Sequence, residues 1–148
     1  MFIPSRVARK VIDAQLRSSP GVTGIVGQEI HHGLNYPQGT NFPACLYRME
    51  SSEFDGVVST GQYEHLTGAQ MRFVIQFDDK GGSDDAIALA WDAMMGAITG
   101  KIIDTADGDQ VTFRPQGEAP LPPYNEGSTR FQRIGTIYSV TVTRGGFS

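Results

Sequence analysis

Residues 71–79 read Met-Arg-Phe-Val-Ile-Gln-Phe-Asp-Asp, the clearest strand pattern in the chain. Apolar side chains stand at every second position from Met71 to Phe77, which gives a strand one uniformly apolar face. The run then ends in Asp78-Asp79-Lys80-Gly81-Gly82, residues typical of a turn. We therefore predict that this strand lies at the centre of a sheet.

Two helices are predicted, one before this strand and one after it. Ser5 is a candidate N-cap for the first helix, in which apolar residues recur every three or four positions until Ser18-Ser19-Pro20-Gly21 ends it. Ser83, followed by two aspartates, begins the second helix, because its hydroxyl can cap free amides and the acids lie at the positive end of the helix dipole. Gly100 ends that helix.

The remaining elements are strands and long connections. We expect strands at 44–49 and 131–143, a hairpin of 102–106 and 110–114 around Asp107-Gly108, and a short irregular strand within 22–32. Two stretches are predicted to be loops, an acidic one at 50–65 and one at 115–129 that contains four prolines. The order of elements predicts one α+β domain over residues 1–148, with a mainly antiparallel sheet of about five to six strands and two helices packed on one face.

Composition narrows the class of protein. With 39% apolar and 19% charged residues among 148, the chain is expected to form a packed core. No apolar run approaches the ~18 residues of a membrane helix, and the N-terminus lacks the apolar block of a signal peptide, so we expect neither a membrane span nor secretion. The single cysteine, Cys45, has no second thiol with which to form an intrachain disulfide, which favours an intracellular origin.

Charge is unevenly distributed along the chain. The net charge is −4, yet residues 1–17 hold four bases and one acid, and residues 130–148 hold three bases and no acid. The middle is therefore strongly acidic. Such a balance argues against a module that grips nucleic acid, and the separated signs suit head-to-tail contact between copies; solvated surfaces are the plainer interpretation.

No catalytic, metal-binding or cofactor-binding motif is found in the sequence. The adjacent His31 and His32 would point to opposite faces of a strand, and no metal-binding or phosphate-cradling spacing occurs. Cys45 stands on an apolar strand face, where a free cysteine is usually a small core residue. The hypothesis of an enzyme or ligand-binding domain would rest on His65 as general acid or base, beside Glu64 or Asp55.

The two predicted loops carry large apolar side chains that a monomer would have to bury. These are Phe54, Val57 and Tyr63 in the first loop and Leu121 and Tyr124 in the second. Aromatic anchors of this kind are common in subunit interfaces, so we predict these residues, with the basic Arg130 and Arg133 that follow them, as contacts with other subunits or a tube. The alternative is that both loops fold back on their own domain.

Several segments of the chain, in their order, resemble a known family. They are GIVGQEIHHGLNYPQGTNFPACLYRM (24–49), with Pro43 and Tyr47 as a Pro-x-x-x-Tyr strand start, then STGQYEHLTGAQMRFVIQFDD (59–79), SDDAIALAWDAMMGAITG (83–100) and TRFQRIGTIYSVTV (129–142). Together they resemble the small tail terminator, or tail completion, proteins of long-tailed bacteriophages. The proline-rich PQGEAPLPPYNEG segment (115–127) is longer than expected for that family.

This resemblance implies a non-enzymatic virion protein without a cofactor. Such proteins form a ring, typically a hexamer, that caps the head-proximal end of the tail tube, ends its polymerisation and joins the tail to the head connector or stopper protein. DNA passes through the ring without specific binding, and no membrane is involved. An acidic lumen would let DNA slide, so we expect acids of the 50–65 loop or the 104–109 hairpin to face the channel: Glu50, Glu53, Asp55, Asp107 and Asp109. A neck or head-completion protein of the same virion region, assembled like the terminator in the host cytoplasm, is the nearest alternative.

Overall fold

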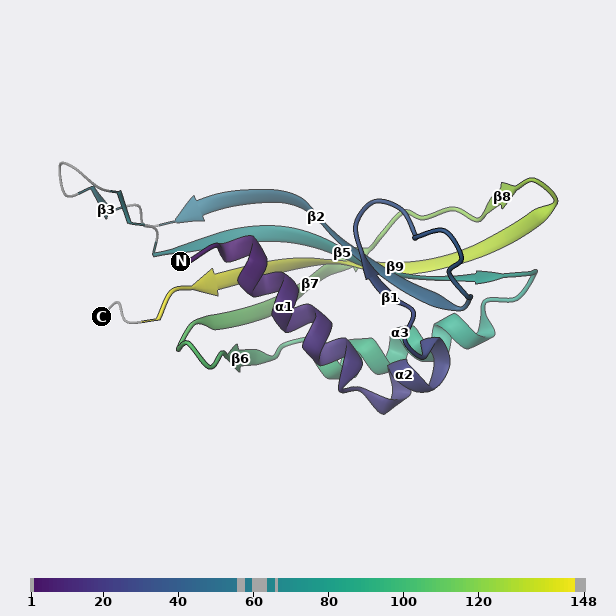
Figure 1. The fold of residues 1–148 in the computed structure, drawn as a ribbon, viewed down its shortest axis with the longest axis horizontal. Helices are drawn as coiled ribbons and strands as arrows, with labels where there is room; N and C mark the ends of the chain where they lie inside the picture. Colours follow the sequence, from purple (N-terminus) through teal and green to yellow (C-terminus); the bar gives the residue numbers. More distant parts are fainter. Residues whose placement is uncertain (1, 56–57, 60–63, 66, 146–148) are drawn as a thin grey trace.

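A long twisted sheet runs through the whole structure (Figure 1). The computed structural model describes residues 2–55, 58–59, 64–65 and 67–145. Within them the strand order is β1-β2-β5-β9-β7-β6, with β8 also paired to β9, and all neighbours are antiparallel except the parallel pair β1 and β2. The strands are β1 Ile30–His32, β2 Ala44–Asp55, β5 Gly68–Lys80, β6 Ile102–Asp104, β7 Gln110–Glu118, β8 Tyr124–Glu126 and β9 Thr129–Thr143. A separate small pair is formed by β3 Val58–Ser59 and β4 Glu64–His65.

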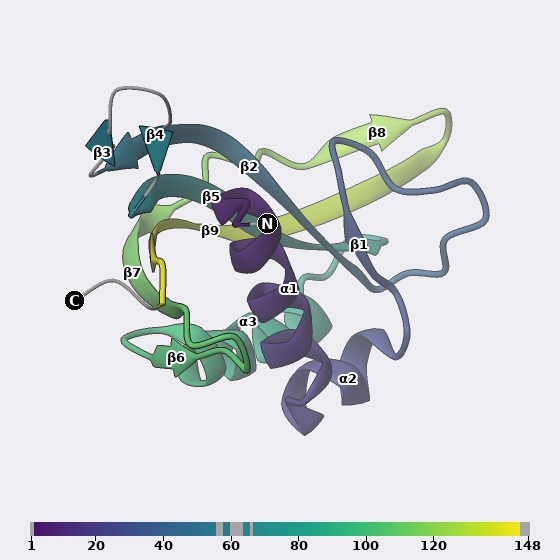
Figure 2. The ribbon, with the colours of Figure 1, turned by 60° about the vertical axis from the view of Figure 1, so that its left-hand side comes forward.

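Three helices lie on one face of this sheet (Figure 2). They are α1 Pro4–Arg17, α2 Pro20–Val26 and α3 Asp85–Ile98. Their apolar stripes meet the alternating apolar residues of β5 and β9 in one core, and Tyr138, Phe73 and Phe77 are its largest fully buried side chains from the sheet. Burying side chains of this size stabilises the fold by about 1.5–3 kcal/mol each. The predicted α+β class and the central strand are confirmed. None of the helices within the described residues is long and apolar enough to cross a membrane.

The segment 20–32 differs from the prediction of a strand. Residues Pro20–Val26 form the short helix α2, and only Ile30–His32 is a strand. Pro20 occupies the first turn of α2, where its missing N–H costs nothing. Tertiary contact then favours the helix, because Gly21 lies so close to α3 that a Cβ there would come within 2.6 Å of the Cβ of Ala93. The first helix also begins two residues earlier than predicted, at Pro4, with Ile3 rather than Ser5 at the N-cap position.

Parts of both predicted loops are strands. Residues 50–55 continue β2 through a bulge between Met49 and Ser51, paired with β5 as far as Gly68. Residues 115–118 belong to β7, and Tyr124–Glu126 form β8. The prolines are tolerated because β6 pairs with β7 only at 110–112, so the outer edge of the strand is free where Pro115 stands.

Candidate functional site

The predicted interface residues lie at the two opposite ends of the sheet. Phe54 pairs with Ala69 at one end, next to the last pair of β5 and β9. Arg133 pairs with Asp78 at the other end, near Tyr124 in β8. About nine residue steps of β5 separate the two places, roughly 30 Å. In Figure 1 the arrowhead of β2 and the strand β8 accordingly lie far apart. We call the two places the Phe54 end and the pocket end.

An exposed aromatic side chain and unpaired acid mark the Phe54 end. The Phe54 side chain is 59% exposed, which is unusual for a phenylalanine in a strand. Residues 50–55 contain three acids and no base. Glu50 lies 3.8 Å from the guanidinium of Arg48, whereas Glu53 is exposed and, among the described residues, has no ion pair. Val57 and Tyr63 lie outside the described residues, as does the side chain of Asp55.

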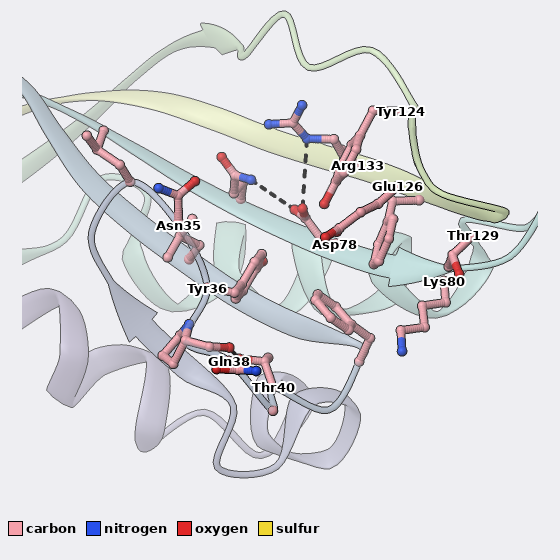
Figure 3. Close-up of a pocket in the computed structure, with 17 residues that line it drawn as sticks. Asn35, Tyr36, Gln38, Thr40, Asp78, Lys80, Tyr124, Glu126, Thr129 and Arg133 are labelled. Atoms are coloured by element: carbon pink, nitrogen blue, oxygen red, sulfur yellow. Dashed lines mark hydrogen bonds and ion pairs between the residues drawn. The ribbon is translucent and has the colours of Figure 1, made fainter.

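A cavity of about 920 Å³ opens at the pocket end, on the sheet face that the helices leave free (Figure 3). One wall is the loop 34–42, and the other is the hairpin of β8 and β9. Its size is within the range of ligand and peptide sites. Four aromatic rings contribute to the lining, together with charged and amide side chains: Tyr36, Phe42, Tyr124 and Phe131, with Asn35, Gln38, Gln76, Asp78, Lys80, Glu126 and Arg133. We call this cavity the sheet pocket.

A buried carboxylate forms the floor of the sheet pocket. Asp78 is only 1% exposed, and its Oδ1 accepts a hydrogen bond of 3.0 Å from the amide of Gln76. The Gln76 oxygen in turn accepts a bond of 2.7 Å from Arg48 on β2. Burial raises the pKa of the Asp78 carboxyl, and the Gln76 bond and the positive charge of Arg133 oppose that rise.

Arg133 and Asp78 are only loosely paired. The Nε of Arg133 lies 3.8 Å from Oδ2 of Asp78, too far for a hydrogen bond. This Nε is buried and has no hydrogen-bond partner among the described residues. Burial, with Asp78 nearby, also raises the pKa of the Tyr36 phenol. The pocket floor therefore has an N–H group, on Arg133, that could donate a hydrogen bond to another molecule.

The aromatic rings connect the two walls of the sheet pocket. Ring centroids lie 5.1 Å apart for Tyr36 and Phe42, 5.0 Å for Phe42 and Phe131, and 4.9 Å for the stacked pair Tyr124 and Phe131. Lys80 lies over the Phe42 ring and Arg133 over the Tyr124 ring, at 5.5 and 5.0 Å. This row fixes the loop and the hairpin in place, so the cavity is preformed.

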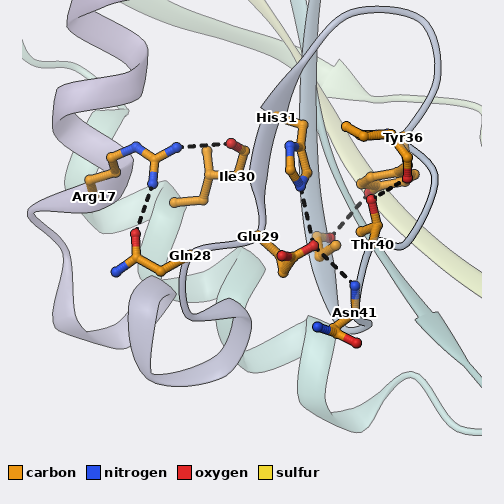
Figure 4. A network of polar contacts seen from close by, with 10 residues as sticks. Arg17, Gln28, Glu29, Ile30, His31, Tyr36, Thr40 and Asn41 are labelled. Atoms are coloured by element: carbon orange, nitrogen blue, oxygen red, sulfur yellow. Dashed lines mark hydrogen bonds and ion pairs between the residues drawn. The ribbon is translucent and has the colours of Figure 1, made fainter.

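Polar contacts hold the base of the loop wall (Figure 4). The Glu29 carboxylate contacts Nε2 of His31 at 3.2 Å and accepts a bond of 3.0 Å from the backbone N–H of Asn41. The Tyr36 hydroxyl donates to the carbonyl of Ala44 at 3.2 Å, and Arg17 donates to the carbonyl of Ile30 at 2.9 Å. The loop is thus attached to the start of β2 and to Glu29 before β1, and β1 in turn is attached to α1.

The second predicted loop partly folds back on its own domain. Leu121 covers Gly135, where a Cβ would lie 2.8 Å from its Cδ1, and Tyr124 stacks on Phe131 as described. Both side chains stay partly exposed at the pocket end. Arg130, on β9, is exposed. Of these predicted residues, Tyr124 and Arg133 line the sheet pocket, Leu121 and Arg130 lie at the same end of the sheet without lining it, and Phe54 is distant from all four.

The predicted channel acids lie in different surroundings. Glu50, Glu53 and Asp107 are exposed. Asp109 is 8% exposed, and its carboxylate accepts a hydrogen bond of 2.8 Å from the N–H of Gly145, so it ties the β6–β7 hairpin to the end of β9 rather than facing solvent. A second cleft of about 540 Å³ separates this hairpin from α1, with bases on the helix and acids on the hairpin: Arg6, Lys10, Asp104 and Asp107.

No catalytic or metal centre is visible in the described part of the chain. No group of three or more His, Cys, Asp or Glu side chains there could hold a metal ion. Burial, with Arg9 nearby, lowers the pKa of His32, whose ring packs on Tyr47 at 5.2 Å. Cys45 is fully buried, as expected for a core residue. The side chains of His65 and Glu64 lie outside the described residues.

The sequence prediction missed Gln76 and Asp78, which line the pocket floor, and Arg48, which bonds Gln76 from β2. A signal was present, because Gln76 and Asp78 occupy the alternate positions of β5, on the face opposite Ile75 and Phe77. Two polar residues in succession on that face indicate either solvent or a polar site. The sequence could not show that a loop and a hairpin cover them.

Comparison with known proteins gives a fold likeness. No family model matches the chain, and no curated protein sequence matches it. Among solved structures, a chain of the "Virion of native gene transfer agent (GTA) particle" superposes with a TM-score of 0.50 and 20% sequence identity, over 89% of this chain and 91% of that one. The two chains share a fold along nearly their whole lengths.

Proposed function

We propose that this protein is a structural component of a phage-like virion, and specifically a tail terminator. In this role several copies form a ring, typically of six, at the head-proximal end of the tail tube. The ring ends tube polymerisation and joins the tail to the head connector, leaving a channel for DNA. The observation that carries the proposal is the fold shared with a chain of a gene transfer agent virion over 89% of this chain. The order of motifs in the sequence, which resembles that of tail terminator proteins, supports the finer role.

The shape of the molecule supports assembly. A closed ring needs a heterologous contact, in which one patch meets a different patch on the next copy. The sheet carries two different patches at its ends, the exposed Phe54 and the sheet pocket. A lone monomer gains nothing from leaving a phenylalanine in water.

Charge supports a channel through which DNA slides. Each copy has a net charge of −4, so the ring as a whole repels phosphates. We assign the exposed Glu50 and Asp107 to the lumen, whereas Glu53 and Asp55 flank Phe54 in sequence. Asp109 is left out because its carboxylate bonds Gly145. A basic lining would hold DNA by releasing counterions, which would oppose ejection.

The test uses the purified chain and the tail tube protein of the same virion. Native mass spectrometry and electron microscopy of the chain alone should show rings. Tubes polymerised in its presence should be shorter and capped at one end. Unaltered tubes would overturn the terminator role, and binding to isolated head connectors without any effect on tubes would assign the chain to the neck instead. His65→Ala should leave the capping of tubes unchanged.

A further inference from the structure

The sheet pocket and Phe54 are the two strongest unassigned features of the surface. The pocket has a preformed aromatic wall and a buried floor whose Arg133 Nε lacks a hydrogen-bond partner within the described residues. Phe54 is an exposed ring at the end of a strand. About 30 Å of sheet separates the two, so the pocket cannot take the Phe54 of its own chain.

We propose that the sheet pocket is the docking site for the Phe54 end of a second copy. This inference rests on the proposed function and names the two surfaces that meet in the ring. The segment Ser52–Phe54 of one copy enters between the loop wall and the β8–β9 hairpin of the next. The contact is head to tail, since each copy offers one Phe54 end and one pocket.

The chemistry of the two surfaces is complementary. The incoming ring meets Tyr36 and Phe42, which favour edge-to-face contacts with another aromatic group. A backbone carbonyl of the incoming strand can accept a hydrogen bond from the Nε–H of Arg133 on the pocket floor, which has no partner within the described residues. The strand β1 pairs with β2 only at residues 45–47, so among the described residues the rest of this edge of β2 has no paired strand and can supply such carbonyls.

Unpaired charges at the two ends have opposite signs. Glu53 adjoins Phe54 in an acidic segment. Of the charged residues that line the pocket, Lys80 has no acidic partner within the described residues, Arg133 and Asp78 are loosely paired, and Glu126 lies on the β8–β9 hairpin. Charge complementarity therefore favours a second copy of this chain over a basic partner as the occupant.

The test is a mixing experiment with two variants of the full chain. Phe54→Asp removes the inserting ring and leaves the pocket intact, whereas Lys80→Glu reverses the charge at the pocket and leaves Phe54 intact. Each variant alone should self-associate at least about tenfold more weakly than the wild type. Mixed in equal amounts, with one isotope-labelled, they should form mixed dimers in native mass spectrometry, because one good contact is restored and neither free end can extend.

Matched controls separate the contact from general effects. Leu89→Asp replaces a similarly exposed apolar residue on α3, and Lys101→Glu an exposed lysine after it. Both should assemble like the wild type. The inference is wrong if the wild type stays monomeric, if either test variant assembles normally, or if the mixture yields no mixed dimers.

Failure of this inference can be told apart from failure of the proposed function. If Lys80→Glu forms normal rings that no longer cap tubes, the pocket serves another virion protein and the second-copy assignment is overturned, while the terminator role stands. If the wild type forms rings that leave tubes unaltered, the terminator role fails and the head-to-tail contact stands.

Discussion

The Nε of Arg133 lies 3.8 Å from the carboxylate of Asp78 at the floor of the sheet pocket, close enough for attraction and too far for a hydrogen bond. Both groups are largely withdrawn from water. Removing one partner of such a pair leaves the other as an uncompensated charge, which is the costly change.

Asp78 should make stability depend on pH. Burial raises the pKa of its carboxyl in the folded state above the unfolded value of about 3.9, so the folded state binds more protons between those two values. The free energy of unfolding of the wild type, relative to Asp78→Asn, should therefore fall as pH rises through that window and level off above the folded pKa. Urea unfolding across a pH series measures this difference. An exposed acid replaced in the same way, Asp107→Asn, corrects for net charge, and a difference independent of pH would contradict the prediction.

Two glycines of α2 should respond in opposite directions to alanine. At Gly21 a Cβ would lie 2.6 Å from the Cβ of Ala93, so Gly21→Ala should force α2 and α3 apart at a cost of about 1–3 kcal/mol. At Gly24 no atom lies within 4 Å of a Cβ, and Gly24→Ala should stabilise the helix by about 0.5–1 kcal/mol. Chemical denaturation of both variants checks this pair. Equal effects would mean that α2 does not pack closely on α3.

A side-chain hydrogen bond should couple α3 to β9. The indole N–H of Trp91 donates to the hydroxyl of Thr136 at 2.7 Å, and Thr136 is buried. In a double-mutant cycle with Trp91→Phe and Thr136→Val, we expect an interaction energy of about 1 kcal/mol. Unfolding followed by circular dichroism gives the four values, because Trp91 is the only tryptophan. Strict additivity would show that the bond contributes nothing.

Cys45 should be inert in the folded protein. Its side chain is fully buried, and burial raises the pKa of the thiol, so the reactive thiolate is both hidden and scarce. A disulfide reagent in mildly alkaline buffer should leave the native chain unmodified and react once per chain after unfolding in guanidinium. Rapid reaction without denaturant would mean that the sheet opens beside α1.

The regular elements were predictable where apolar residues alternate. The alternation in β5 and β9 predicts strands, and the structure confirms them. The helix α3 lies where it was predicted, but its N-cap residue is Asp84 and has no side-chain cap; the predicted cap Ser83 precedes it and accepts a hydrogen bond of 3.3 Å from the N–H of Asp85. α2 was not predictable, because Gly21 and Gly24 disfavour a helix and only the contact with Ala93 explains it.

The ends of the sheet were harder to predict for a different physical reason. Residues 50–55 extend past the core, so both faces of β2 are polar there and the alternation disappears. The strand around Pro115 lies at an edge, where proline is permitted. The aromatic residues of both segments predict contacts with other subunits. The sequence could not show how far apart the two segments lie, because that distance depends on how the strands pair.

The series of polar contacts from Arg48 through Gln76 to Asp78 also disfavours an incorrect pairing register between the strands of the sheet. If β9 slipped by one residue along β5, Arg133 would move to the helix-covered face, opposite Phe77 or Asp79, and leave Asp78 without its cation. A slip by two residues would set Arg133 opposite Lys80 or Gln76 and leave Asp78 without its cation. Mispaired sheets are therefore penalised by several kcal/mol for each buried charge left alone, and a chain built mainly of long strands needs such discrimination to reach a single alignment.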